Sequence, residues 1–481
     1  MIIERVLTVL YLFGCIGVGV FASRKVAASA SEYWVAGRRV GPFVNSMAIM
    51  AALASGGSII GVMGLAYAQG IPATLALFTG AIVGFPMAAI LVAAPLRKFG
   101  KFTISDFLSF RYPHPIVRYM VPILIVVTFT AYIVAQMKAA GITAEALLGI
   151  PYVTALTLAT LVFITYVSVG GMIAITWTDV FQGTLMLMVI LGAAAVLIMK
   201  VGSPLEMIRQ ATVASPELGL MGADQPVTSY LGSFVIWAAA ISVIPHIVMR
   251  VFTAKDSRGA KLSLNLSMVV YAIMILAAVL AIVPVGKMNF PGLENADMVF
   301  LRVMETEFHP IFRGIAVAAV LAAVMSTTDA LLLACSSAIA HDLLGNFLNR
   351  RLSQKGVHWV TVSVAWIVGL TAMFLAYNPP ALITEFYTIA IGLLSGGLFV
   401  PVVAGLWWKK ANLAGGTAAL VVGVLAYVIV QFELVMTFPA GSAILISLPA
   451  SAVAMWMGGQ FGTAETTEMI DTIANLHVEE S

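Results

Sequence analysis

The stretch AAVMSTTDALLLACSS, residues 322–337, lies inside one of the most apolar parts of this chain. It nevertheless carries four consecutive polar residues, Ser326 to Asp329, and two more hydroxyls at Ser336 and Ser337. Serine and threonine are common at packed transmembrane interfaces, where they bond a carbonyl one turn back. A carboxylate inside a membrane span is costly and usually marks a functional or paired site. The stretch therefore predicts a membrane-spanning helix that borders a polar gap between helices.

The composition of the whole chain predicts an all-α polytopic membrane protein. Of its 481 residues, 61% are hydrophobic and 10% are charged, and the mean hydropathy is +1.02. A soluble domain has roughly 25% charged residues. The net charge of +3 is spread over short loops, so we expect no nucleic-acid partner. Cys15 and Cys335 both fall in apolar runs and are expected to be small packing residues.

Apolar runs of about 20 residues, the length that crosses a bilayer, recur along the chain and predict about thirteen spans. The first run does not resemble a cleaved signal, because Glu4 lies beside Arg5 before it and its basic pair, Arg24 and Lys25, follows it. The expected limits are 4–23, 43–69, 74–96, 119–141, 152–170, 176–199, 230–250, 264–286, 311–340, 358–377, 383–407, 412–431 and 438–459.

The 25 lysines and arginines are distributed unequally between the two sides of these spans. Cytoplasmic loops carry an excess of Lys and Arg, which orients the chain with its N-terminus outside. Lys138 lies within a span, and six residues lie outside: Arg5, Lys200, Arg209, Lys287, Arg302 and Arg313. The remaining eighteen lie inside: Arg24, Lys25, Arg38, Arg39, Arg97, Lys98, Lys101, Arg111, Arg118, Arg250, Lys255, Arg258, Lys261, Arg350, Arg351, Lys355, Lys409 and Lys410.

Three further polar features occur within the spans. MAALASGGSIIGVMG, residues 50–64, has paired glycines that either interrupt a helix and free carbonyls for Na⁺, or allow close helix packing. Asp179, in ITWTDVFQG, begins the sixth span and lies either at the interface or in the interior. Lys138 either snorkels outward, pairs with an acid such as Asp329, or faces an anionic substrate.

The chain has no enzyme signature: HExxH, GxSxG, a Walker A loop and clustered Cys/His ligands are all absent. We therefore expect a transporter and not an enzyme, with no organic cofactor. Without a nucleotide site, transport must draw on an ion gradient.

Several motifs together resemble the sodium:solute symporter family. They are AAVMSTTDALLLACSSAIAHDLL in the ninth span, SEYWVAGRRVG after the first, GKFTISDFLSFRY before the fourth and VGGMIAITWTDVFQG leading into the sixth. IPHIVMRVFTAKDSRGAKLS is most similar to the branch that carries acetate and other monocarboxylates. YNPPALI and GLWWKKANLAGGTAALVVG are similar to the pantothenate permeases.

The resemblance implies a LeuT-like core of two inverted five-helix repeats, about 43–199 and 230–407, in a transmembrane domain over 1–461. Residues 462–481 are then a short acidic cytoplasmic tail, which we expect to be disordered. Asp179 corresponds to a family aspartate near the sodium site that in some members helps to bind a second ion. Asp329 occupies a position at which the residue type differs among members of the family. At the position of Leu53, in the broken helix, some members have an acidic residue. The implied Na⁺ ligands are the carbonyls of Ala51, Ala54 and Ala323 and the hydroxyls of Ser326 and Thr327.

By resemblance, the substrate binds beside the break in the second span. The expected function is Na⁺-coupled symport of a small organic anion, a monocarboxylate such as acetate, pyruvate or lactate, into the cell by alternating access across the plasma membrane. Alternatives are a Na⁺/pantothenate symporter, a proton-coupled carrier using Asp329 or Asp179, a membrane sensor and a passive channel. The candidate substrate residues are Ser55, Ser58, Tyr132, Gln136, Lys138, Trp237 and Tyr387.

Overall fold

The computed structural model describes residues 2–23, 30–167, 172–220, 225–347, 353–379 and 382–478. These residues are nearly all helical, and the single β-bridge among them joins Val40 to Ala254. Some expectations from the sequence lie outside the described residues. They are the basic residues Arg24, Lys25, Arg350 and Arg351, the end of the fifth span at 168–170, and the last three residues of the tail.

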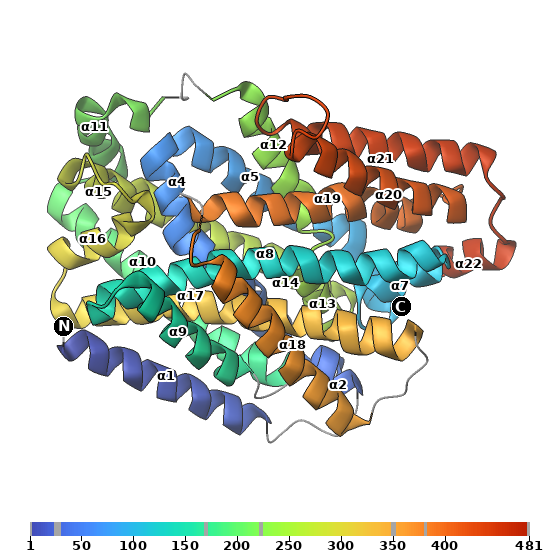
Figure 1. Cartoon of the computed structure of the whole chain (residues 1–481), viewed down its shortest axis with the longest axis horizontal. Helices are drawn as coiled ribbons and strands as arrows, with labels where there is room; N and C mark the ends of the chain where they lie inside the picture. The colour runs from blue at the N-terminus through green and yellow to red at the C-terminus, as the bar shows by residue number, and fades with distance from the viewer. Residues whose placement is uncertain are drawn as a thin grey trace.

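Each predicted span coincides with one helix or with a broken pair of helices (Figure 1). Ten described helices are long and apolar enough to cross a bilayer, and one bent pair adds an eleventh. The bounds are α1 (Ile2–Ser23), α3 (Pro42–Leu53) with η2 (Gly57–Gly61) and α4 (Val62–Gln69), α5 (Ile71–Ala88) with η3 (Ala89–Ala93) and α6 (Ala94–Phe99), α8 (Pro115–Leu148), α9 (Tyr152–Val167), α10 (Met172–Val201), α12 (Val227–Ala240) with α13 (Pro245–Thr253), α14 (Ser257–Ala277) with η5 (Ala278–Ile282) and α15 (Val283–Asn289), α17 (Pro310–Ser337) with η7 (Ala338–Phe347), α18 (Gln354–Leu375), α19 (Ile383–Trp407), α20 (Leu413–Gln431) and α21 (Ser442–Phe461).

Short helices lie at the two ends of the bundle. Figure 1 shows α11, α15 and α16 at the end where the N-terminus lies, and α7 and α22 at the opposite end. The short elements are α2 (Ala30–Val35), η1 (Ala36–Arg38), α7 (Ile104–Arg111), α11 (Pro204–Ala214), η4 (Pro216–Leu218), η6 (Ala296–Met298), α16 (Val299–Glu307) and α22 (Thr467–Asn475).

The second span is broken at its paired glycines, as the interruption hypothesis predicts. Its two halves, 42–53 and 57–69, meet at an angle of 62°. A Cβ at Gly56 would lie 2.7 Å from Val324 Cγ2 and 2.8 Å from Ala139 Cβ. A Cβ at Gly57 would lie 2.5 Å from Tyr387 Cε1. Glycine is therefore required here because three other helices approach the backbone closely.

The seventh span is also interrupted, which the sequence analysis did not predict. Helix α12 ends at Ala240, and α13 begins at Pro245 after a short turn. Proline has no amide hydrogen to donate to the preceding turn, and it is tolerated at the first position of a helix. The amides of Val243 and Ile244 both donate to the Ala240 carbonyl at 2.8 Å, which closes the end of α12.

Helix α17 lies at the centre of the bundle, where it packs against α1, α8, α10 and α18. In its most apolar 18-residue window, 94% of the residues are buried inside the protein. The hydroxyl-rich stretch therefore faces other helices and not lipid, which is why its polar groups are tolerated.

The expectation of a disordered tail after Phe461 is wrong for the described part of that segment. Helix α22 buries Ile473 against the bundle, and His477 Nε2 lies 2.9 Å from the Leu406 carbonyl of α19. Glu465 forms an ion pair with the buried Arg111 at 3.1 Å. The buried Ile473 side chain and the ion pair of Glu465 therefore hold this segment against the bundle.

We predict that Gly56→Ala lowers the free energy of unfolding by about 1–3 kcal/mol, because the added methyl overpacks the contact between the broken helix and α17. Thermal unfolding of the detergent-purified protein measures this change. The matched control is Gly14→Ala in α1, where an added Cβ meets nothing within 4 Å. Equal losses of stability in both variants would contradict the packing argument.

Candidate functional site

The break after α3 redirects two backbone amides that would otherwise continue the helix. Ser55 N donates to the Leu53 carbonyl at 2.8 Å. Gly56 N donates to Oε1 of Gln136, a residue of the neighbouring helix α8, at 3.0 Å. In an unbroken α-helix each of these amides would bond the carbonyl four residues earlier. The break therefore leaves two carbonyls at the end of α3 without their helical donors.

Those two carbonyls belong to Ala51 and Ala52, and hydroxyls of α17 occupy the place of the lost donors. Ser326 Oγ donates to the Ala51 carbonyl at 2.9 Å and also lies 3.2 Å from the carbonyl of Ala323. Thr327 Oγ1 donates to the Ala52 carbonyl at 3.0 Å. Five oxygen atoms of α3 and α17 thus take part in two neighbouring, fully buried contacts between these helices.

This arrangement suits a small hard cation. All five oxygens are neutral, and sodium-sized ions prefer oxygen ligands. The C-terminal end of α3 also contributes the negative end of its helix dipole. Four of the five predicted ligands meet here, whereas the carbonyl next to Thr327 is that of Ala52, two residues before the expected Ala54. The bend after Leu53 decides which carbonyls face α17.

Asp179 is buried in an ion pair with Arg250 of α13. Both side chains are at most 1% exposed, so Asp179 lies inside the helix bundle. Arg250 also donates to Thr176 Oγ1 at 2.5 Å, and its carbonyl accepts a hydrogen bond from Asn45 at 3.0 Å. The expectation that Arg250 lies in a cytoplasmic loop is wrong, because the break before α13 carries it into the bundle.

Asp329 lies three residues after Ser326, on the same face of α17, and is 2% exposed. Its Oδ1 has no hydrogen-bond partner among the described residues. Asp179 and Arg250 both act on it electrostatically. The Asp329 carboxyl therefore lies close enough to the Asp179–Arg250 ion pair to interact with it.

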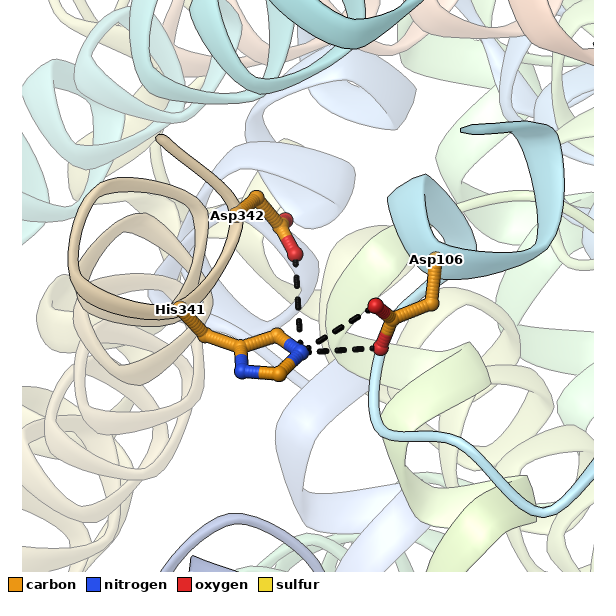
Figure 2. A group of neighbouring side chains, drawn as sticks. All are labelled: Asp106, His341 and Asp342. Atoms are coloured by element: carbon orange, nitrogen blue, oxygen red, sulfur yellow. Dashed lines mark hydrogen bonds and ion pairs between the residues drawn. The ribbon is translucent and has the colours of Figure 1, made fainter. Parts of the chain in front are cut away.

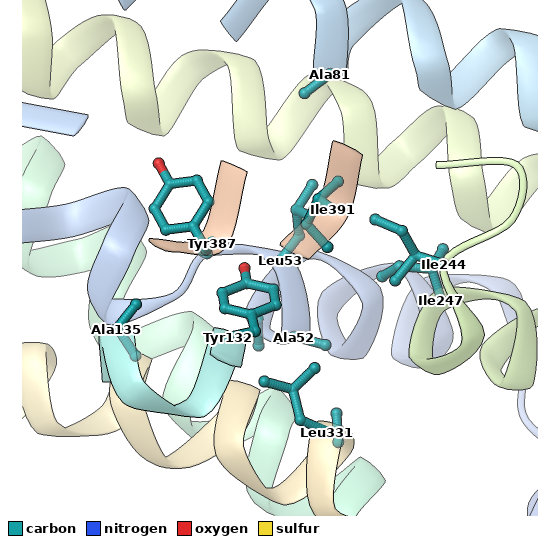
Figure 3. Close-up of a cluster of buried hydrophobic side chains, with 14 of the residues drawn as sticks. Ala52, Leu53, Ala81, Tyr132, Ala135, Ile244, Ile247, Leu331, Tyr387 and Ile391 are labelled. Atoms are coloured by element: carbon teal, nitrogen blue, oxygen red, sulfur yellow. The ribbon is translucent and has the colours of Figure 1, made fainter. Parts of the chain in front are cut away.

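Aromatic residues predicted to line the substrate site meet beside the break. The ring centroids of Tyr132 and Tyr387 are 5.5 Å apart, and those of Trp237 and Tyr387 are 5.8 Å apart. Figure 3 shows Tyr132 and Tyr387 next to Leu53, with Ile244 of the second break nearby. All are buried, so this cluster lies in the interior between α3, α8, α12 and α19.

Three buried side chains around this cluster have nitrogen atoms without a hydrogen-bond partner among the described residues: Gln136 at Nε2, Trp237 at Nε1 and His246 at both ring nitrogens. Gln136 contacts the break through Gly56 N, Trp237 contacts Tyr387, and His246 packs against Tyr132. Buried donors are normally satisfied, so each exception needs an explanation. A bound group that only accepts hydrogen bonds, such as a carboxylate, is the kind of partner that the amide and indole nitrogens require.

The predicted serines lie at the break itself, next to the aromatic cluster: a Cβ at Gly57 would lie 2.5 Å from Tyr387 Cε1 and 3.1 Å from Ser55 Oγ. A residue that the sequence analysis missed lies beside them. Ser58 Oγ donates to the Leu53 carbonyl at 3.0 Å and lies 3.5 Å from Ser55 Oγ. It also lies 3.4 Å from the hydroxyl of Tyr271, on α14. Nothing in the sequence pattern separates this tyrosine from the other aromatic residues of the spans.

Lys138 pairs with an acid, as one of the three alternatives predicts, but the acid is Asp297. Its Nζ lies 2.8 Å from Asp297 Oδ2, and this ion pair is 6% and 0% exposed on its two sides. The same oxygen accepts a hydrogen bond from Ile383 N at 3.1 Å. The hypothesis of a pair with Asp329 is therefore wrong for this structure, because Lys138 points to η6 at the end of the bundle where α16 lies.

Known proteins share both the sequence pattern and the architecture of this chain. A model of the sodium:solute symporter family matches residues 33–423. The sodium/proline symporter of Escherichia coli K12 is 30% identical over 95% of each chain. The sodium/pantothenate symporter of Haemophilus influenzae is 27% identical over 94% of this chain and 95% of that protein. The substrate-bound, outward-open structure of a Na⁺-coupled sialic acid symporter has the same LeuT-like fold. It superposes with a TM-score of 0.80 at 18% identity and covers 96% of this chain and 99% of that chain.

We predict that Arg250→Met lowers the free energy of unfolding by about 3–5 kcal/mol, because it leaves Asp179 buried without its cation. The double variant with Asp179→Asn should recover much of that loss. Chemical or thermal unfolding in detergent measures both.

The matched control for Arg250→Met is Arg209→Met, which removes an exposed ion pair with Glu206 and should leave the midpoint nearly unchanged. A similar loss in the control, or no recovery in the double variant, would contradict the role given to the buried pair.

Proposed function

Since the chain belongs to the sodium:solute symporter family, in which solute movement is coupled to Na⁺, we propose that it imports a small carboxylate-bearing solute by alternating access. One observation carries the choice of solute class. Gln136 Nε2 and Trp237 Nε1 are buried donors without acceptors beside the broken helix. A carboxylate accepts hydrogen bonds from both, and it is also attracted by the positive end of a half-helix that begins at the break.

Na⁺ binds between the end of α3 and the middle of α17. Its ligands are the carbonyls of Ala51, Ala52 and Ala323 and the hydroxyls of Ser326 and Thr327. Dehydration of Na⁺ is costly, so the oxygens must all be in place together. Bound Na⁺ then holds the end of α3 against α17 and sets the shape of the break where the solute binds.

The cluster of Asp179, Arg250 and Asp329 supplies electrostatic support for this ion. Asp329 lies on the Ser326 face of α17, and in its ionised form it would give the cluster a net negative charge. A second cation beside Asp329 would balance the two carboxylates. Coupling to protons instead of Na⁺ would use the same two acids, so the coupling ion must be measured.

The expected solutes are monocarboxylates, and pantothenate and proline are the competing ones. Each of them has a carboxylate for the two unsatisfied donors, and the two relatives named above are a proline and a pantothenate symporter. The aromatic surface of Tyr132, Trp237 and Tyr387 suits a short apolar chain or ring next to that carboxylate.

The distribution of basic residues orients the transporter with its N-terminus outside and its C-terminus in the cytoplasm. The end of the bundle that carries α7 and α22 then faces the cytosol (Figure 1). This chain acts in the plasma membrane, where the inward Na⁺ gradient is available.

The experiment that tests the proposal is uptake into proteoliposomes of labelled acetate, pyruvate, pantothenate and proline, with and without an inward Na⁺ gradient. Accumulation that requires Na⁺ and is lost with a sodium ionophore supports symport, and the accumulated compound identifies the solute. Accumulation driven by a proton gradient without Na⁺ would refute sodium coupling. Uptake without accumulation would indicate a passive channel.

We predict that Thr327→Ala raises the Na⁺ concentration for half-maximal uptake about tenfold or more, because a lost ligand oxygen is worth about 1–3 kcal/mol. Thr328→Ala is the matched control. Its hydroxyl is equally buried but bonds the Val324 carbonyl of its own helix at 2.7 Å, so the Na⁺ requirement should barely change. An unchanged Na⁺ requirement in Thr327→Ala would refute this assignment.

We predict that Trp237→Phe raises the KM for the solute about tenfold, because phenylalanine keeps an aromatic ring but lacks the indole donor. Initial uptake rates at saturating Na⁺ measure the effect. Trp34→Phe, at a buried tryptophan of α2, serves as the control and should leave the KM unchanged. If the KM of Trp237→Phe matches that of the control, the indole does not bind the carboxylate.

A further inference from the structure

Three potential metal ligands converge at the end of the bundle that carries α7. They are Asp106 of α7 and two neighbours in η7, His341 and Asp342 (Figure 2). His341 Nε2 lies 3.0 and 3.1 Å from the two oxygens of Asp106 and 4.0 Å from Asp342 Oδ1. One ligand atom from each residue lies within 4.8 Å of the others. Segments 235 residues apart in the sequence thus form one compact cluster.

The two carboxylates are held in place by the start of α7. Asp106 Oδ2 accepts hydrogen bonds from the amides of Phe102 and Thr103 at 3.1 and 3.2 Å. Thr103 Oγ1 accepts from Asp106 N at 3.0 Å and donates to Asp342 Oδ1 at 2.9 Å. A capping box therefore fixes one ligand and, through the same threonine, orients the other. Such outer contacts preorganise metal ligands.

The cluster contains more acceptor capacity than its described neighbours use. The side chains of Asp106 and Asp342 are only 8% and 4% exposed. Asp342 Oδ2 has no hydrogen-bond partner among the described residues. Figure 2 shows this carboxylate and that of Asp106 on the same side of the imidazole, toward the same ring nitrogen.

We infer that Asp106, His341 and Asp342 form a binding site for a divalent transition metal such as Zn²⁺. One imidazole nitrogen and two carboxylate oxygens are a donor set that Zn²⁺ accepts, at about 2.0–2.2 Å from the metal. A divalent cation with a neutral imidazole balances both carboxylates. His341 and Asp106 already lie at the separation of adjacent ligands, and Asp342 needs only a small movement inward. The fourth position stays open to water.

Metal at this site joins α7 to the end of α17. Thr327 lies 14 residues before His341, about 21 Å along the same helical rod. The site is therefore separate from the proposed Na⁺ ligands, although it is attached to the helix that carries three of them. The inference does not depend on the proposed function, because metal binding is measured without transport.

The test is a titration of the purified, untagged, metal-free full chain with Co²⁺, followed by its visible d–d absorption, and then with Zn²⁺ as competitor. We expect one Co²⁺ per chain, displaced by one Zn²⁺. His341→Gln and Asp342→Asn should each weaken binding at least about tenfold. Both variants keep a side chain that forms hydrogen bonds, so the fold can be compared by thermal unfolding.

The matched control is His358→Gln, which removes an exposed histidine of α18 and should leave Co²⁺ binding unchanged. Absence of stoichiometric d–d absorption from the wild-type chain would overturn the inference in favour of a metal-free imidazolium bridge. Binding that persists unweakened in either His341→Gln or Asp342→Asn would also overturn it, since the metal would then be held elsewhere.

Discussion

The structure depends on one set of contacts, in which hydroxyls of α17 replace the helical donors that α3 loses at its break. Ser326 bonds the Ala51 carbonyl and Thr327 bonds the Ala52 carbonyl, deep inside the bundle. Without these hydroxyls the two carbonyls would be buried and unsatisfied, which is unfavourable in a membrane protein. The same contacts therefore make a broken helix tolerable and assemble an oxygen cage of the kind that a small cation requires.

Buried ion pairs connect the helices around this cage. Arg250 joins α13 to Asp179 of α10, and Lys138 joins α8 to Asp297 of η6. In each pair both partners are almost fully excluded from solvent, so neither charge can separate without a large cost. Pairs of this kind specify which helices pack together. Asp329 differs from these acids, because its Oδ1 has no hydrogen-bond partner among the described residues.

The substrate region follows a different rule, because it contains donors that the protein leaves unsatisfied. Gln136 uses its oxygen to hold the broken helix at Gly56, which leaves its amide nitrogen for another group. Trp237 presents its indole nitrogen beside the same aromatic cluster. Under the proposed function, structural support and solute recognition would be assigned to different atoms of Gln136. A bound solute would then be coupled to the position of the break.

The meeting of Ser326 with the end of α3 was expected only from the resemblance to the sodium:solute symporter family. The sequence by itself determined the helical class, the positions of the spans and the break at the paired glycines. These features follow from apolar period, glycine content and local motifs, which act over short distances along the chain. Only the tertiary structure decided the partner of each buried polar group. In the folded chain Thr327 bonds the Ala52 carbonyl, Arg250 lies inside the bundle, and Lys138 pairs with Asp297 of η6. These partners depend on how each helix is rotated about its axis and on the second break, before Pro245. A shift of one residue in the rotation of a helix or in the position of the break would change which residues meet. The folded tail α22 was missed for the same reason, because its apolar stripe has meaning only against the surface that receives it.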